Sequence, residues 1–152
     1  MLPGSVYVVL GANASQIESA ISSAMVIVND QWQEGIGTSI ACGVRHVDKQ
    51  YQTVLVLLAD QPLIQSEHLK SMLDAYIGGN IVCAKYRGAR GVPAIFPESC
   101  FDQLKGLSGD NGAKRLLQTT QLPVIELDMP EASFYVDRVD DMSALHVHYN
   151  RR

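Results

Sequence analysis

The sequence predicts an α/β fold, organised as a three-layer sandwich around a mostly parallel, Rossmann-like sheet. Two observations predict it: short apolar strands alternate with amphipathic helical segments, and the strand at 53–59 is apolar without polar alternation. Such a continuous apolar run is typical of a parallel strand that is covered on both faces. The chain has 152 residues, a length that suits one domain, and we expect 1–152 to form a single domain.

Each element is assigned from its apolar periodicity and from the glycines, prolines and capping residues at its ends. The expected strands are Val6–Leu10, Met25–Val28, Thr53–Ala59, Ile81–Ala84, Val92–Phe96 and Val124–Leu127. The first expected helix follows Ala12–Ser15 and runs to about Ser23, and the second runs from Thr38 or Ser39 to His46. The other expected helices are Ser66–Tyr76, Glu98–Leu104 and Ala113–Thr119.

Composition and charge limit the classes of function that are open to this chain. It carries a formal net charge of −4 without a Lys or Arg cluster, which argues against nucleic acid as a partner. No apolar stretch approaches the length of a membrane span, so we expect no membrane partner. The three cysteines, Cys42, Cys83 and Cys100, are widely spaced, which favours free thiols in a reducing cytoplasm over disulfides or a zinc site.

Asp60 is the most informative residue, because it follows the apolar strand directly and precedes a turn that Pro62 enforces. In an open α/β sheet, ligands bind at the carboxyl ends of the strands. A carboxylate at that edge is well placed to hold a hard cation such as Mg²⁺ beside a polyphosphate. Asp60 alone is equally compatible with capping the next helix, and both interpretations stay open at this point.

Three further segments are candidates for a binding site, and each also has a purely structural interpretation. Gly35–Ser39 is a glycine-rich entry to a helix, where free N–H groups favour anions or carbonyl acceptors, but a capped turn explains it as well. Arg90–Phe96 joins a cation and a glycine to a proline, as an ordinary turn into a strand does. Gly109–Lys114 opens a helix and contains side chains that can cap it. Trp32, the only tryptophan, is assigned to packing.

In this order, the segments resemble the MobA/MocA-like nucleotidyltransferases, the family that completes the molybdenum cofactor. The matching elements are the base-lining segment at 35–43, the Asp-Gln-Pro metal site at 60–62, a Gly-x-Pro-x-x-Phe element at 91–96 and a Gly-Asp-x-Gly-Ala-Arg element at 109–114, where Lys114 replaces the arginine. The Asp-Gln-Pro tripeptide favours the cytidylyltransferase branch over the guanylyltransferase branch.

The resemblance implies transfer of CMP from CTP to the phosphate of molybdopterin-bound molybdenum cofactor, with release of pyrophosphate and with Mg²⁺ as cofactor. It implies Asp60 as the catalytic residue and metal ligand, and Asp140 as a possible second ligand. The implied nucleotide-binding residues are Gly35, Gly37, Thr38, Ser39, Gln61 and Pro62. The implied binding residues for the pterin substrate are Arg90, Gly91, Pro93, Gly109, Asp110, Gly112 and Lys114. The expected partners are CTP or another nucleotide, molybdopterin and a molybdoenzyme acceptor.

Two departures from the family bear on activity. Members begin with a strand and a Leu-Ala-Ala-Gly-x-Ser-x-Arg-x-Gly-x-x-Lys loop that holds pyrophosphate, and this sequence shows no such segment before Val6. Arg138 stands where the family has the first acid of an Asp-Ile-Asp-Thr-Pro-Glu-Asp element, while Asp140 matches the second. We therefore expect impaired transfer. A non-catalytic protein that binds a nucleotide or pterin, or serves a molybdoenzyme, is the alternative, and a native start upstream of Met1 is a third possibility.

The first strand of the family also leads to an expectation about the sheet. In the family it lies between the strands that correspond to Val6–Leu10 and Thr53–Ala59. Two buried edges without partners would cost about 1–3 kcal/mol for each unpaired group. We therefore expect these two strands to pair directly with each other, and a strand supplied by a second chain is the other route.

Overall fold

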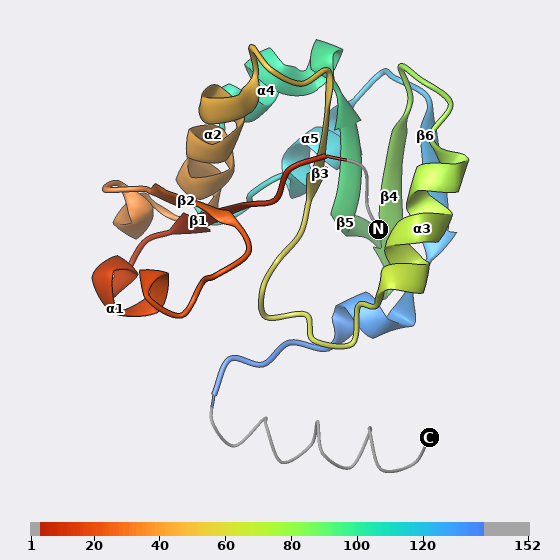
Figure 1. The fold of residues 1–152 in the computed structure, drawn as a ribbon. Helices are drawn as coiled ribbons and strands as arrows, with labels where there is room; N and C mark the ends of the chain where they lie inside the picture. The colour runs from red at the N-terminus through yellow and green to blue at the C-terminus, as the bar shows by residue number, and fades with distance from the viewer. Residues whose placement is uncertain (1–3, 139–152) are drawn as a thin grey trace, which may run out of the picture.

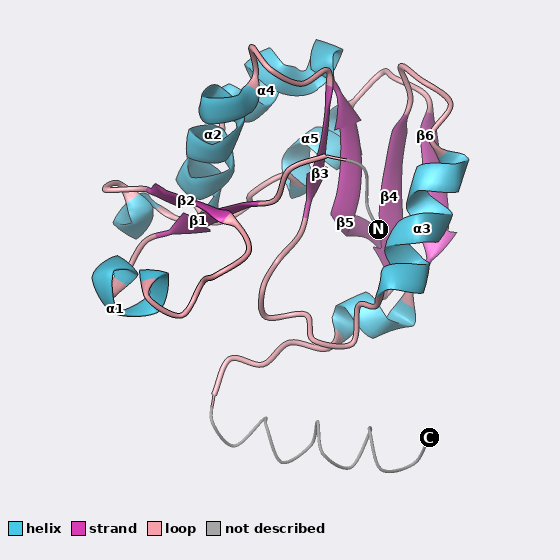
Figure 2. Cartoon of the chain, in the orientation of Figure 1, coloured by secondary structure: helices cyan, strands magenta, loops and turns pink. Residues whose placement is uncertain are grey.

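The computed structural model describes residues 4–138 of the chain (Figure 1). Helices and strands alternate along most of this range, which confirms the α/β class (Figure 2). The elements are β1 Tyr7–Leu10, α1 Ala14–Glu18, β2 Met25–Val28, η1 Trp32–Glu34, α2 Ile36–Val47, β3 Thr53–Val56, α3 Ser66–Ala75, β4 Ile81–Tyr86, β5 Ala89–Pro97, η2 Glu98–Cys100, α4 Phe101–Lys105, α5 Lys114–Thr119, β6 Val124–Asp128 and η3 Pro130–Ser133. Among the described residues, no helix combines the length and the apolar character needed to cross a membrane.

A four-stranded sheet in the order β3-β5-β4-β6 forms the middle layer of the fold. In β4, Ile81 and Cys83 belong to the hydrophobic core that α2, α4 and α5 cover. Val82 and Ala84 point to the opposite face, because side chains alternate along a strand, and they belong to the core beneath α3. The sheet therefore separates two helical layers, as the three-layer prediction requires (Figure 1).

Strand directions in this sheet are mixed. β4 and β6 are parallel, with Ile81 opposite Val124, and so match the expected arrangement. β5 runs antiparallel to both β3 and β4. Arg87 and Gly88 connect β4 to β5 with φ angles of 52° and 74°. Positive φ at both central residues is the geometry of a two-residue hairpin turn, which makes these strands antiparallel.

β1 and β2 form a separate, parallel sheet of two strands. Within the described residues β3 pairs only with β5, so β1 and β3 share no ladder, and the expected direct pairing of these two strands is wrong. Side chains instead connect the regions at the amino-terminal ends of β1 and β3. Tyr51 Oη donates to Ser5 Oγ at 2.8 Å, and the ring of Tyr7 packs edge-on against that of Tyr51.

The exposure of β3 explains how one of its edges can remain without a partner strand. All four residues of β3 are half-buried rather than buried, and 45% of the surface of Leu57 is exposed. Water can hydrogen-bond the backbone of such an edge, so the cost expected for buried unpaired groups does not arise. β3 also ends at Val56, before the expected Ala59, because its ladder with β5 ends there, opposite Ala94.

Candidate functional site

The turn that follows β3 contains the expected metal ligand, Asp60. Its Oδ1 atom is buried and has no hydrogen-bond partner in the described structure. Loss of hydration raises the pKa of the Asp60 carboxyl above its usual value, and the negative charge of Asp137 raises this pKa further. A buried acceptor oxygen without a donor is the kind of atom that a bound cation satisfies.

The segment after η3 brings a second carboxylate to this turn. The Val136 N–H donates to the Asp60 carbonyl oxygen at 2.9 Å, and the next residue, Asp137, is exposed and acts on the Asp60 pKa. Sequence reasoning missed Asp137, because the matching family element starts at Arg138 and a single acid before it carries no signal of its own. Asp140, the expected second ligand, lies outside the described residues.

Gln61, expected to bind nucleotide, has only 4% of its surface exposed and holds the turn to the rest of the protein. Its Nε2 donates to the carbonyl oxygens of Val92 in β5 at 3.1 Å and of Ala132 in η3 at 2.7 Å. Its Oε1 is buried and has no hydrogen-bond partner among the described residues. Gly91 and Pro93 flank Val92 and are themselves buried, so this element does lie against the turn, as its assignment to the same site requires.

The two glycine-rich motifs contact each other directly. The Gly37 N–H donates to the Gly109 carbonyl oxygen at 2.9 Å, and the Gly109 N–H donates to the Glu34 carbonyl oxygen at 2.9 Å. A Cβ at Gly35 would lie 2.4 Å from the backbone of Gly109, and one at Gly37 would lie 2.8 Å from that of Ser108. Loop packing therefore requires these two glycines, whether or not a ligand also approaches them.

Asn29 fixes the start of α2 and was missed by sequence reasoning. It is buried, and its Nδ2 donates to Thr38 Oγ1 and to Ser39 Oγ, both at 3.0 Å. Its Oδ1 accepts the Gln31 N–H at 3.0 Å. Both hydroxyls expected to contact nucleotide are therefore oriented by one amide. Asn29 follows β2 directly, just as Asp60 follows the apolar strand, so the same signal was present in the sequence.

A surface cavity of about 430 Å³ lies at the carboxyl ends of β1 and β2. Its lining includes Gly11, Asn13, Asn29, Asp30 and Trp32. Trp32 packs against Gly11, where an added Cβ would lie 2.4 Å from the tryptophan Cβ, so the packing role expected for it is observed. Since 42% of Trp32 nevertheless remains exposed, its indole is also available to a ligand in the cavity.

The two cations expected to bind the pterin differ in their surroundings. Arg90 is half-buried and engaged by other residues, since its Nε donates to Glu126 Oε1 at 2.7 Å and its Nη1 to the Leu117 carbonyl oxygen at 2.9 Å. Lys85 Nζ lies 2.7 Å from the other oxygen of Glu126. Hydrogen bonds from Lys85 and then Arg90 lower the pKa of Glu126. Lys114 begins α5 and is exposed.

Most of the described residues assigned from the sequence thus fall into two groups. One gathers at the Asp60 turn and comprises 60–62 with 91–93, where Pro62 is half-buried. The other gathers at the start of α2 and comprises 35–39 with 109–112, where Asp110 is exposed and Gly112 is buried.

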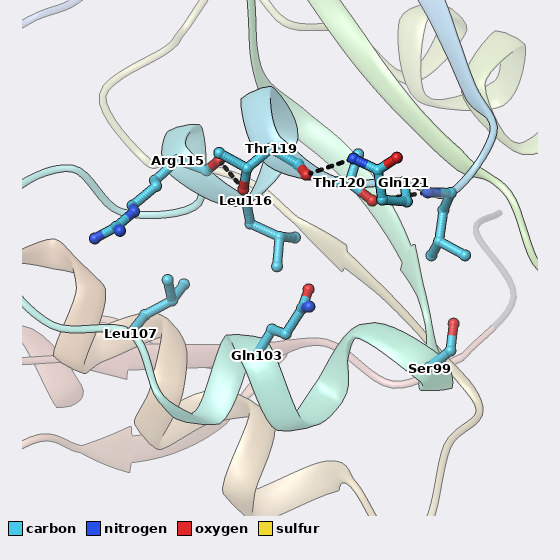
Figure 3. A pocket seen from close by; sticks show the side chains of 9 residues that line it. Ser99, Gln103, Leu107, Arg115, Leu116, Thr119, Thr120 and Gln121 are labelled. Atoms are coloured by element: carbon cyan, nitrogen blue, oxygen red, sulfur yellow. Dashed lines mark hydrogen bonds between the residues drawn. The ribbon is translucent and has the colours of Figure 1, made fainter.

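A second cavity, of about 470 Å³, lies between α4 and α5 (Figure 3). Gln103 and Leu107 contribute to one side of it, and Arg115 and Leu116 to the other (Figure 3). None of the assigned residues that the structure describes lines this cavity, so we do not include it in the candidate site.

An α/β sandwich with an acid after a strand and a glycine-rich helix start has the features of a nucleotide-binding protein. Residues 2–124 match the MobA-like NTP transferase domain, and the chain belongs to this family. The resemblance inferred from the motifs is thereby confirmed.

Two relatives and one solved structure show how far the similarity extends. The purine catabolism protein PucB of Bacillus subtilis (strain 168) is 36% identical over 91 residues, which are 59% of this chain and 44% of PucB. The nicotine blue oxidoreductase of Paenarthrobacter nicotinovorans is 28% identical over 152 residues, covering 92% of this chain and 74% of that protein. The crystal structure of the Rv0371C complex with manganese from Mycobacterium tuberculosis H37Rv superposes with a TM-score of 0.74 at 26% identity, covering 93% of this chain and 76% of that one. This chain thus spans less than half the length of PucB.

Proposed function

We propose that this protein binds a nucleoside triphosphate together with a divalent cation and transfers the nucleotidyl group to the phosphate of a molybdopterin-type acceptor. Membership in the MobA-like NTP transferase domain family supports the reaction class. The observation that carries the proposal is the Asp60 turn, where a buried oxygen without a partner lies near the Asp137 carboxylate. The Asp-Gln-Pro sequence at 60–62 supports CTP as the nucleotide.

A divalent cation fits the atoms of this turn. Asp60 Oδ1 is a buried acceptor without a donor among the described residues, and Asp137 adds negative charge. Carboxylate oxygens are ligands that Mg²⁺ takes in proteins, usually together with waters and substrate phosphates. The manganese in the similar Rv0371C structure supports the same class of ion.

In the proposed reaction, an oxygen of the acceptor phosphate attacks the α-phosphorus of CTP, and the bond from that phosphorus to the oxygen bridging the β-phosphate breaks. CMP becomes joined to the acceptor and pyrophosphate leaves. A bound cation would neutralise the negative charge that develops on the phosphate as it is transferred. The ionised carboxylates of Asp60 and Asp137 would hold the cation, and the Val136–Asp60 hydrogen bond joins the backbones of the two segments that carry them.

The cavity at the ends of β1 and β2 is proposed to hold the base of the nucleotide. Asn13, Asn29 and Asp30 supply donors and acceptors there, and Trp32 exposes part of its ring. The described lining contains no lysine or arginine, which favours a neutral ring over a phosphate. Asn29 also connects this cavity to the start of α2, the segment that the resemblance assigns to the base.

Trp32 provides the test, because it is the only tryptophan of the chain. Titration with CTP in the presence of Mg²⁺ should change the tryptophan fluorescence until the site is saturated, and GTP should bind more weakly. Asp60→Asn should remove the Mg²⁺-dependent part of the response. Asp74→Asn, a change at an exposed acid on α3, should respond as the wild type does.

Transfer is measured separately, as pyrophosphate released from CTP in the presence of molybdenum cofactor. Release that Asp60→Asn abolishes would support a nucleotidyltransferase. Saturable binding without release would support the non-catalytic alternative, a protein that binds nucleotide or pterin. A fluorescence signal that no nucleotide changes in the presence of Mg²⁺ would contradict the proposal.

A further inference from the structure

We propose that Gln61 is a positioning residue that sets the separation of the Asp60 and Asp137 carboxylates, by clamping together the two segments that carry them. This inference rests on the proposed function, in which both carboxylates hold a divalent cation. It also replaces the nucleotide-binding role expected for Gln61, whose side chain is directed into the protein, with 4% of the residue exposed.

The two acids need such a clamp because they come from distant loops. Asp60 lies between β3 and α3, whereas Asp137 follows η3 near the end of the described residues. Neither residue belongs to a helix or a strand, so no helical turn or strand ladder determines how far apart their carboxylates stand. Their separation must be set by contacts between the two loops.

The Gln61 amide supplies the central contact. Its Nε2 carries two N–H groups, and these donate to the Ala132 carbonyl oxygen at 2.7 Å and to the Val92 carbonyl oxygen at 3.1 Å. Ala132 is fully buried in η3, and Val92 belongs to β5, an interior strand of the larger sheet. One side chain therefore ties the Asp60 turn both to the sheet and to the segment that leads to Asp137.

Two neighbouring contacts hold the rest of that segment in place. The Val136 N–H donates to the Asp60 carbonyl oxygen at 2.9 Å, directly before Asp137. The hydroxyl oxygens of Tyr135 and Tyr86 lie 3.0 Å apart. Burial, followed by this hydrogen bond, raises the pKa of Tyr86, and Gln61 partly offsets the rise, which places Gln61 next to the tyrosine pair.

The chemistry of the clamp requires a neutral double donor at position 61. Methionine has a similar length but would leave the Val92 and Ala132 carbonyl oxygens without their donor. Side chains that orient the ligands of a metal without touching it typically contribute about 10–100-fold to metal affinity. Loss of the Gln61 amide should therefore weaken the binding of a cation that Gln61 does not need to contact.

The test is the affinity of the whole chain for Mn²⁺, measured from the electron paramagnetic resonance signal of the free ion. Gln61→Met should weaken Mn²⁺ binding about 10–100-fold. Gln103→Met, at an exposed position of α4, should bind as the wild type does. In the Asp137→Asn background Gln61→Met should add little further loss, because the acid that it positions is already absent. A full additional loss in that background would overturn the positioning role.

Asp60→Asn separates this inference from the proposed function. If Asp60→Asn leaves Mn²⁺ affinity unchanged, the proposed cation site itself is wrong. If it abolishes binding while folded Gln61→Met binds like the wild type, only the positioning role is wrong. Gln61→Asn, whose amide is one methylene shorter, replaces Gln61→Met if the latter does not fold. In the unmodified protein the Val136 amide should resist hydrogen exchange, and exchange at the rate of an open loop would show that the clamp does not form.

Discussion

The backbone N–H of Gly37 donates to the carbonyl oxygen of Gly109 at 2.9 Å, and this hydrogen bond joins two glycine-rich motifs that lie far apart in the sequence. Gly37 is in the first turn of α2 and its φ lies outside the left-handed region, so its backbone conformation does not require glycine. Space requires it, since a Cβ would lie 2.8 Å from the Ser108 backbone. The loop at 108–109 therefore positions the start of α2.

Gly37→Ala should lower the free energy of unfolding, although alanine normally stabilises a helix by about 1 kcal/mol relative to glycine. Overpacking against neighbouring atoms typically costs about 1–3 kcal/mol, and here the neighbour is backbone that cannot rotate away. Urea unfolding measures the difference. Gly106→Ala is the matched control, because its Cβ would meet carbonyl oxygens at an ordinary 3.6 Å. Unchanged stability of Gly37→Ala would show that the loops do not pack as described.

Asn29→Ala should destabilise the protein by about 1–3 kcal/mol, because it removes the acceptor of the Gln31 N–H and the amide that donates to the Thr38 and Ser39 hydroxyls. Asn29→Asp keeps the acceptor for Gln31 but removes the donor to Thr38 and Ser39, and should cause a smaller loss. Chemical denaturation with Trp32 fluorescence reports both values. Equal losses for the two variants would mean that the hydrogen bond from the Gln31 N–H to Asn29 Oδ1 contributes nothing.

Asp60→Asn should raise the stability of the metal-free protein at neutral pH. Burial, and then the charge of Asp137, raises the pKa of Asp60 above its usual 3.8, so the folded state disfavours the ionised carboxylate. The stability that the protonated acid contributes is fully present below pH 3.8, the ordinary pKa of aspartate. It is lost as the pH rises through the raised pKa of Asp60 in the folded state. Urea unfolding should therefore show a gain for the variant at neutral pH that disappears below pH 3.8. A gain that persists at acid pH would have another cause.

Local sequence patterns were sufficient for most of the fold. β2 has the predicted bounds Met25–Val28, because the apolar run and its polar ends are both local. α3 begins at Ser66 as predicted and ends close to Tyr76, ahead of Gly78. The α/β class follows from this alternation of strands and helices, and the alternation can be recognised without knowing which distant segments are in contact.

The remainder depends on contacts between distant segments. The length and pairing of β3 depend on which strand stands beside it, and its own apolar pattern does not encode that neighbour. Asp137 becomes part of the candidate site only because η3 returns the chain to the Asp60 turn. The motif around Asp60 identified Gln61 but did not indicate where its side chain points. A glutamine that binds a ligand and one that hydrogen-bonds to backbone have the same sequence signal.

Calorimetric titration with CTP and Mg²⁺ tests most directly the central claim, that the Asp60 turn holds a cation needed for nucleotide binding. The wild-type protein should bind CTP with a heat that depends on Mg²⁺, and Asp60→Asn should lose that dependence and most of the affinity. Asp74→Asn should behave as the wild type does. Equal, Mg²⁺-dependent binding of CTP by Asp60→Asn and by the wild type would contradict the claim.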